Sequence, residues 1–370
     1  MEPSWASSVR LQEYVLIRID PSVPNHCAPG DVVTTPILPM LKAIAKTTLR
    51  DDFYREDQTT YMFEEHIADL VGHEAGMFVL SGTMGNQIAL RTHLMQPPHS
   101  VLCDARSHIV HREAGGLASL SGAMLQAVAP RNDEWLTLED IKLRAVLSDD
   151  VHHCPTAVIS LENTISGLVH PLNEIQRISS WARQNEVKLH LDGARLWEAD
   201  AAGGGSLRDY AICFDSVSLD FSKGLGAPMG AMILGNKGYV SKARRIRKSI
   251  GGGMRQAGVL SGPALSAINE TFGPGVWGRE IGGKLRDVHS KAREIAGMWK
   301  GRGGKLHRRV ETNLIYVDLQ DARTSEADFC ELGRIYGIKL DGYRIVVHYQ
   351  ISEEALRRLD GVFREVFSSH

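Results

Sequence analysis

The middle of the chain alternates between two hydrophobic patterns, one with helical spacing and one made of short continuous apolar runs. In residues 62–72, MFEEHIADLVG, apolar side chains recur every three or four positions, which predicts an amphipathic helix that ends at Gly72. The short apolar runs are bounded by turn residues and predict strands: GMFVLSGT, SVLCDARSH, MLQAVAP, AVISLEN, VKLHLDGA, SVSLDFSKG and GAMILGN. Helix-length stretches such as LNEIQRISSWARQNE separate several of these runs. Buried parallel strands have this appearance, so we expect an α/β domain whose mostly parallel sheet is covered on both faces.

The pattern changes after about residue 255. A helical region over about 260–300 precedes the runs NLIYVDL and YRIVVHYQIS. A closing amphipathic helix then starts at Ser352 and carries an apolar face of Leu356, Leu359, Phe363 and Val366. This order of elements predicts a smaller α+β domain. We therefore expect three parts: a partly disordered N-terminal segment over 1–28, a large α/β domain over 29–255 and a small C-terminal α+β domain over 256–370.

The composition of the chain narrows the class of protein. Its 370 residues are 43% hydrophobic and 23% charged, with a net charge of −2, which gives no reason to expect nucleic acid or an anionic membrane as a partner. No apolar run approaches the ~20 residues of a membrane helix, and no signal peptide is predicted. The five cysteines are widely spaced and predict reduced thiols in a cytoplasmic enzyme. No metal site is expected, because HHC at 152–154 lacks partners at ligand spacing.

The carboxyl ends of the predicted strands carry residues with chemical potential, as is usual in α/β sheets. After one strand, Gly82 and Thr83 open a helix whose N–H groups can hold a phosphate. Asp192 ends the run VKLHLD, Lys223 follows SVSLDFS, and His108 follows SVLCDARS. Singly, each has an ordinary explanation as a helix cap, a turn former or a solvated side chain. Together, the phosphate seat, the acid and the lysine predict pyridoxal phosphate, which needs a lysine for its aldehyde, an acid for its ring nitrogen and an anchor for its phosphate.

Longer motifs surround these residues. They are DDFYREDQTT, SGTMGNQIALRTHL, SHIVHREAGG, SLENT, LHLDGARLWEA, FSKGLGAPMGA, RKSIGGGMRQAG and RIVVHYQ. With these motifs the chain resembles the threonine aldolase family of fold-type I pyridoxal phosphate enzymes, from DVVTTP at 31–36 to the C-terminus. The resemblance implies the fold-type I architecture, with a small C-terminal α+β domain, and a small amino acid as substrate.

The resemblance also assigns roles on the cofactor side. Lys223 would bind the cofactor as a Schiff base, and Asp192 would pair with its ring nitrogen. Gly82 and Thr83 would hold the phosphate. Arg255 of GGGMRQ would assist them, and in this family that arginine reaches in from a neighbouring subunit. A homo-oligomer, either a dimer or a dimer of dimers, is therefore implied.

Three residues are assigned to the substrate side by the same resemblance. His108 would stack on the cofactor ring and lie near the substrate side chain. Arg195 of DGAR and Arg344 of YRIVVHY would bind the substrate carboxylate. A guanidinium group suits this task because it can pair with both carboxylate oxygens at once.

The substrate side departs from the family pattern, whereas the cofactor side does not. Gly30 stands where a serine usually helps to hold the substrate carboxylate. Ile165 stands where many relatives have a histidine near the substrate hydroxyl, and Asp220 stands where a small residue is common. The residues that match the family therefore imply the cofactor, whereas these departures leave the reaction open.

Two reactions therefore remain open. One is retro-aldol cleavage of a β-hydroxy-α-amino acid to glycine and an aldehyde. The other is alanine racemisation, since some fungal alanine racemases of cyclic-peptide biosynthesis resemble threonine aldolases. A racemase needs a second acid–base group opposite Lys223, for which Tyr54 is the candidate. The retained His108 can act near a Cβ hydroxyl and favours the aldolase.

Overall fold

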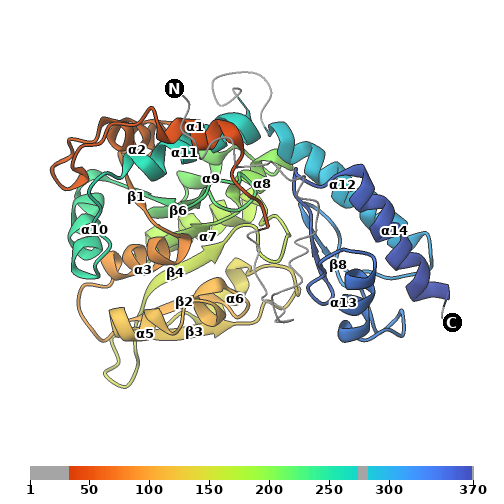
Figure 1. Ribbon diagram of the computed structural model, residues 1–370. Helices are drawn as coiled ribbons and strands as arrows, with labels where there is room; N and C mark the ends of the chain where they lie inside the picture. Colours follow the sequence, from red (N-terminus) through yellow and green to blue (C-terminus); the bar gives the residue numbers. More distant parts are fainter. Residues whose placement is uncertain (1–32, 274–281, 369–370) are drawn as a thin grey trace. The chain divides into compact units, whose positions relative to one another are not determined.

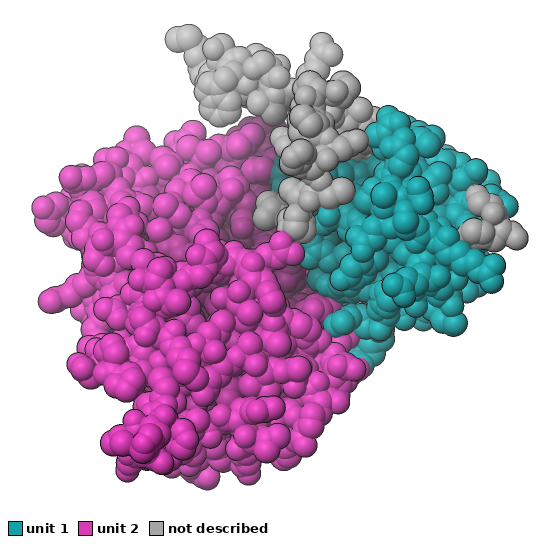
Figure 2. All heavy atoms as spheres, turned by 90° about the horizontal axis from the view of Figure 1, so that it is seen from below, with its two compact units in different colours: residues 1–35, 287–370 teal, residues 36–286 magenta. Residues whose placement is uncertain are grey.

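The computed structural model describes residues 33–273 and 282–368. The chain forms two compact units, a large one over 36–286 and a small one that combines 1–35 with 287–370 (Figures 1 and 2). The sequence pattern predicts the boundary after residue 255. Residues 256–286 belong to the large unit because α11 (Gly258–Ala267) packs against α1 (Leu38–Ile44) and α2 (Gln58–Val71). The expectation for residues 1–28 lies outside the described residues.

The large unit is built on a seven-stranded sheet with the order β1-β7-β6-β5-β4-β2-β3. β7 is antiparallel to both of its neighbours, and the other paired strands are parallel, which confirms the mostly parallel sheet. Each apolar run that predicted a strand in this part of the chain forms one. The strands are β1 (Ala75–Val79), β2 (Ser100–Asp104), β3 (Met124–Val128), β4 (Thr156–Glu162), β5 (Lys188–Gly193), β6 (Ser216–Asp220) and β7 (Ala231–Gly235).

Hydrophobic side chains pack on both faces of this sheet, and helices cover them (Figure 1). Along β1, Phe78 belongs to the largest core, whereas Met77 and Val79 belong to a separate core that includes Ile88 of the following helix, α3 (Gly82–His93). The alternation follows from the pleat of a strand, which directs successive side chains to opposite faces. The further helical elements of the large unit are η1 (Asp52–Tyr54), α3 (Gly82–His93), α4 (His108–His111), α5 (Gly116–Ser121), α6 (Leu138–Arg144), α7 (Leu172–Gln184), α8 (Leu196–Ala201), α9 (Leu207–Ala211), α10 (Lys237–Ser249) and η2 (Ile268–Phe272).

Local chemistry sets the ends of the helices. α2 begins at Gln58 because the side chain of Asp57 accepts a hydrogen bond from the N–H of Thr60. It ends at Gly72, whose φ of 77° is a left-handed conformation that glycine adopts without strain. The predicted end at Gly72 is thus confirmed, whereas the start lies one turn earlier than the apolar pattern suggested.

The small unit has its own hydrophobic core, which includes Trp299, Phe329 and Phe363. Its two strands, β8 (Leu314–Tyr316) and β9 (Arg344–Val346), are antiparallel. The helices that supply the core are α12 (Gly283–Lys300), α13 (Glu326–Ile335) and α14 (Glu353–Ser368). The predicted α+β character and the closing amphipathic helix are confirmed. In the described parts of the chain, no helix combines the length and the apolar character needed to cross a membrane.

Candidate active site

The predicted phosphate seat is the first turn of α3. Gly82 begins this helix after a short connection from β1, and the hydroxyl of Ser81 caps the helix by accepting a hydrogen bond from the N–H of Met84 at 3.1 Å. Gly82 and Thr83 are half-buried. The N–H groups of a first helical turn have no partner within the helix and carry partial positive charge, so they can bind an anion.

Asp192 occupies the end of β5 and is buried. Its two carboxylate oxygens accept hydrogen bonds from different donors. The amide of Asn86 on α3 donates to Oδ2 at 2.7 Å, and the N–H of Ala194 donates to Oδ1 at 3.1 Å. These two bonds hold the carboxylate in one orientation, as an acid that must face a cofactor ring requires.

Lys223 follows β6 and is half-buried. Burial lowers the pKa of its amine, and the nearby guanidinium of Arg195 lowers it further. The carboxylates of Asp220, Asp192 and Glu162 act in the opposite direction without cancelling the shift. A larger fraction of the amine is therefore neutral and nucleophilic than for an exposed lysine.

His108 begins the short helix α4 and is held by Glu113. Its Nδ1 lies 2.8 Å from Oε1 of this buried glutamate, and this contact is the largest cause of the raised pKa of His108. Asn86 donates to the same Oε1 at 2.9 Å and also to Asp192. A ring nitrogen of His108 and carboxylate oxygens of Glu113 and Asp192 all lie within 4.8 Å of one another. One asparagine thus links the predicted ring-nitrogen partner to the predicted substrate-side histidine.

Glu162 is a site residue that the sequence interpretation missed. It ends β4 opposite Asp192 in the parallel register, and its Oε2 accepts the backbone N–H of His108 at 2.9 Å. Burial and the neighbouring carboxylate of Asp192 raise its pKa to about 8. The sequence does carry a signal for Glu162. The apolar run AVISL is followed directly by this acid, in the same way as the run VKLHL is followed directly by Asp192.

Arg195 lies in the same region of the large unit. It is the residue before α8 and is buried, with 7% of its surface exposed. Its charge lowers the pKa of Lys223, so the two side chains are within electrostatic range of each other. The predicted cofactor lysine and this predicted carboxylate-binding arginine are therefore brought together.

Arg255 and Arg344 have other surroundings. Arg255 forms an exposed ion pair with Asp51, and its guanidinium lies 5.3 Å from the ring centroid of Phe53. No contact between Arg255 and Gly82 or Thr83 is observed within the described residues. Arg344 belongs to β9 of the small unit, where its guanidinium is 3.5 Å from Asp341. The roles predicted for these two arginines stay predictions.

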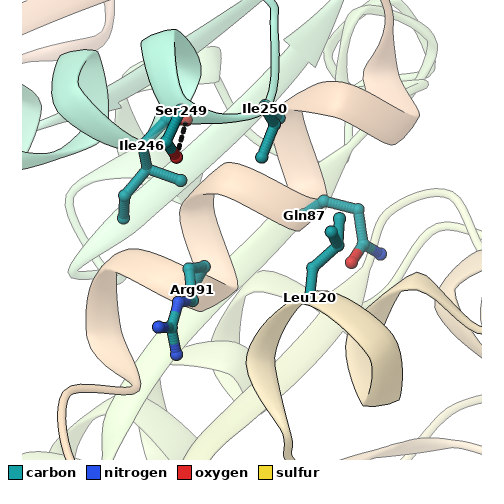
Figure 3. A pocket seen from close by; sticks show the side chains of 6 residues that line it. All are labelled: Gln87, Arg91, Leu120, Ile246, Ser249 and Ile250. Carbon is teal, nitrogen blue, oxygen red and sulfur yellow. Dashed lines mark hydrogen bonds between the residues drawn. The ribbon is translucent and has the colours of Figure 1, made fainter.

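The large unit has a surface pocket between α3, α5 and the end of α10. Gln87, Arg91, Leu120, Ile246, Ser249 and Ile250 line it, and none of them is a predicted site residue (Figure 3). Gln87 connects the pocket to the site, because its amide nitrogen donates to Glu113. A smaller pocket includes Glu162 and Ile165, together with Asp104, Trp135, Leu136, Leu161 and His170.

Solved structures share this architecture. A putative L-allo-threonine aldolase from Listeria monocytogenes superimposes with a TM-score of 0.73 at 24% identity, over 90% of this chain and 93% of its own. A threonine aldolase from Leishmania major gives a TM-score of 0.74 at 19% identity, over 91% and 98%. The fold is thus that of the fold-type I enzymes, as predicted.

Sequence relatives define the family. Residues 30–322 match the beta-eliminating lyase family. The chain is 49% identical to alanine racemase TOXG of Cochliobolus carbonum, over 92% of this chain and 87% of the relative, and 50% identical to aldolase vrtJ of Penicillium aethiopicum, over 92% and 86%. It is 43% identical to the low-specificity L-threonine aldolase of Saccharomyces cerevisiae, over 91% and 85%. The chain belongs to the beta-eliminating lyase family.

Proposed function

We propose that the chain is a pyridoxal phosphate enzyme that cleaves a β-hydroxy-α-amino acid of the L-threonine or L-allo-threonine type to glycine and an aldehyde. The observation that carries this proposal is the placement of His108, fixed by Glu113, beside the strand-end acid Asp192. Relatives named as low-specificity L-threonine aldolases, at 40–45% identity, support the same reaction.

The residues present fit this cofactor. The amine of Lys223 would bind the aldehyde, the first turn of α3 at Gly82 and Thr83 would hold the phosphate, and Asp192 would keep the ring nitrogen protonated. When bound, the cofactor supplies a protonated ring that withdraws electrons from the substrate Cα. Asn86 keeps Asp192 aimed, since it donates to one of the two carboxylate oxygens.

His108 would remove the proton from the substrate hydroxyl. Glu113 accepts the hydrogen bond of Nδ1–H, which leaves Nε2 as the basic nitrogen. Loss of the hydroxyl proton lets the Cα–Cβ bond break as the aldehyde forms. Arg195, and Arg344 in the small unit, would bind the substrate carboxylate.

Alanine racemisation is the second candidate. Ile165 is buried and lines the small pocket beside Glu162, so an apolar side chain stands where a hydroxyl-binding histidine would otherwise be expected. An alanine racemase among the relatives supports this reading. Tyr54, the candidate for the second acid–base group, is 75% exposed on the surface of its own chain.

Product analysis separates the two reactions. The purified enzyme is given L-threonine, L-allo-threonine and L-alanine in separate reactions in deuterium oxide. We expect acetaldehyde and glycine from a hydroxy amino acid, at a rate well above deuterium incorporation at Cα of alanine. We also expect His108→Ala to lower this cleavage by about 10²–10⁴-fold, the usual contribution of a positioned base. D-alanine as the main product, with cleavage unaffected by His108→Ala, would replace the aldolase by the racemase.

We also propose a homo-oligomer in which Arg255 reaches the phosphate of a neighbouring subunit. In its own chain, Arg255 is exposed and pairs with Asp51, so its guanidinium is at the surface where a second subunit could meet it. Arg255→Ala should lower cofactor affinity by about tenfold or more, because a charge-assisted contact contributes ~1.5–3 kcal/mol. Light scattering and a cofactor titration check this. A fully active monomer would contradict it.

A cytoplasmic location is part of the same proposal. Cys103 and Cys213 are buried and form no disulfide bond. Buried thiols that stay reduced are typical of cytoplasmic proteins. Protease protection and fractionation of cells that produce the tagged protein would test the location.

A further inference from the structure

Asp220 places a carboxylate at the phosphate seat. It is the last residue of β6 and is buried, with 6% of its surface exposed. A Cβ atom added to Gly82, the first residue of α3, would lie 2.9 Å from Oδ2 of Asp220. The N–H and hydroxyl of Ser222 both donate to the other oxygen, Oδ1, at 2.6 and 2.7 Å. Oδ1 is thus fixed by the chain, and Oδ2 lies against the start of the helix.

This position matters because a helix N-terminus attracts one anion more readily than two. A phosphate bound at Gly82 and Thr83 would lie close to a carboxylate that is already there. Like charges in a partly buried site oppose each other strongly, since water screens them poorly. The conflict is relieved when the carboxyl group takes up a proton, because it then becomes a hydrogen-bond donor.

The other groups around Asp220 do not remove this conflict. α3 and β7 present uncharged residues to it, namely Gly82 and its register partner Ala231. Lys223 is a nearby basic group, and Asp220 counteracts the lowering of its pKa, but the same amine would bind the cofactor aldehyde. On the neighbouring strand β5, Asp192 pairs in register with Ser218 of β6. Ser218 lies two residues before Asp220, so both point to the same face of the sheet. The carboxylate of Asp192 therefore adds negative charge on the side of Asp220.

We propose that Asp220 weakens cofactor binding by this chain and couples it to the uptake of one proton from solvent, so that Oδ2–H donates to a phosphate oxygen in the loaded enzyme. The proposal rests on the proposed function, which supplies the cofactor. It implies that cofactor affinity falls as the pH rises. It also implies that this loss comes from the phosphate and not from the aldehyde end of the cofactor.

The test compares two cofactor forms on the full-length protein. Apoenzyme is titrated with pyridoxal phosphate and with pyridoxal, which lacks the phosphate, from pH 6 to 9, and binding is followed by absorbance and tryptophan fluorescence. The variants are Asp220→Asn, which keeps the size of the side chain, and Asp220→Ser, which replaces the carboxylate by a neutral hydroxyl donor. Asp215→Asn is the matched control, because it removes the same charge just before the other end of β6. The ionisation of the cofactor itself is common to all variants and cancels in the comparison.

We expect both Asp220 variants to bind pyridoxal phosphate about 10⁴-fold more tightly than the wild type at pH 8, because pH 8 lies about four units above the ordinary pKa of an aspartate side chain and each unit costs a factor of ten in affinity. Their affinity should fall less steeply with pH than that of the wild type, whereas pyridoxal binding and the Asp215→Asn control should match the wild type. Equal effects on both cofactor forms would overturn the proposal, because Asp220 would then act on Lys223. Unchanged affinity and pH slope in the variants would overturn it as well. The proposed function fails separately, if borohydride reduction of the loaded wild type attaches no cofactor to Lys223.

Discussion

Lys223→Ala is expected to abolish turnover and to remove the covalent attachment of the cofactor. The amine is the group that would bind the aldehyde, and no change elsewhere in the site can replace that bond. We expect activity to fall by about four orders of magnitude or more, as for the loss of other covalent catalytic groups. The cause is chemical and not structural, because Lys223 follows β6 in a glycine-rich turn and is half-buried, so its truncation leaves the sheet intact.

Borohydride reduction followed by peptide mapping checks this expectation directly. The wild type should carry the label on the peptide that contains Lys223, and Lys223→Ala should carry none. Lys237→Ala is a matched control, since Lys237 is exposed at the start of α10 and takes no part in the site. A label on another lysine of the wild type, or substantial activity in Lys223→Ala, would remove the central assignment.

Much of the candidate site can be predicted from sequence because its residues stand at or just after the carboxyl ends of strands. Parallel strands bring their carboxyl ends to one edge of the sheet, so residues far apart in the sequence meet there without any knowledge of their contacts. Asp192 is the next-to-last residue of β5, Lys223 follows β6, and Gly82 follows β1 with a short connection. The runs that carry them are apolar enough to be identified as strands from sequence. Their order along the chain was therefore sufficient to predict that they meet.

The partners of these residues were harder to predict. Asn86 projects from α3 and joins Asp192 to Glu113, a contact between three separate elements that no local pattern records. Glu162 follows the strand-end pattern, but many such residues only form turns, and its meaning depends on the register that sets it opposite Asp192. The boundary between the units was misplaced for a similar reason. α11 carries no charged residue and no distinct polar face, and its packing against α1 and α2 assigns it to the large unit.

Arg255 and Arg344 mark the limit of prediction from one chain. The motif GGGMRQ assigns Arg255 by resemblance, while its observed partner is Asp51 at the surface. Arg344 is placed by β9 in the small unit, and its guanidinium lies 3.5 Å from Asp341. The contact that would complete the role of Arg255 depends on assembly, and hydrophobic patterns within one chain carry no information on that step.

Asp192→Asn is the second change with a large expected effect. The amide has the size of the carboxylate, so Gly82, Thr83 and Lys223 remain to hold the cofactor, and binding should persist. The neutral amide cannot stabilise a proton on the ring nitrogen, so the ring would lose most of its capacity to withdraw electrons from Cα. We expect turnover to fall at least about a thousandfold, comparable to the loss of a preorganised electrostatic group in other enzymes.

Two measurements distinguish this effect from a loss of structure. The absorbance spectrum of the bound cofactor should change in Asp192→Asn, since the protonation state of the ring nitrogen alters the chromophore. Thermal unfolding should change little by comparison, and Asp215→Asn, which removes a carboxylate outside the site, should keep the wild-type spectrum and rate. Asn86→Ala provides an intermediate case: it removes the 2.7 Å donor to Oδ2 but leaves the carboxylate charge, so it should lower turnover less than Asp192→Asn. Near-normal turnover in Asp192→Asn would mean that the ring nitrogen needs no anionic partner here, and the acid at the end of β5 would then serve only to hold Asn86 and the network to His108.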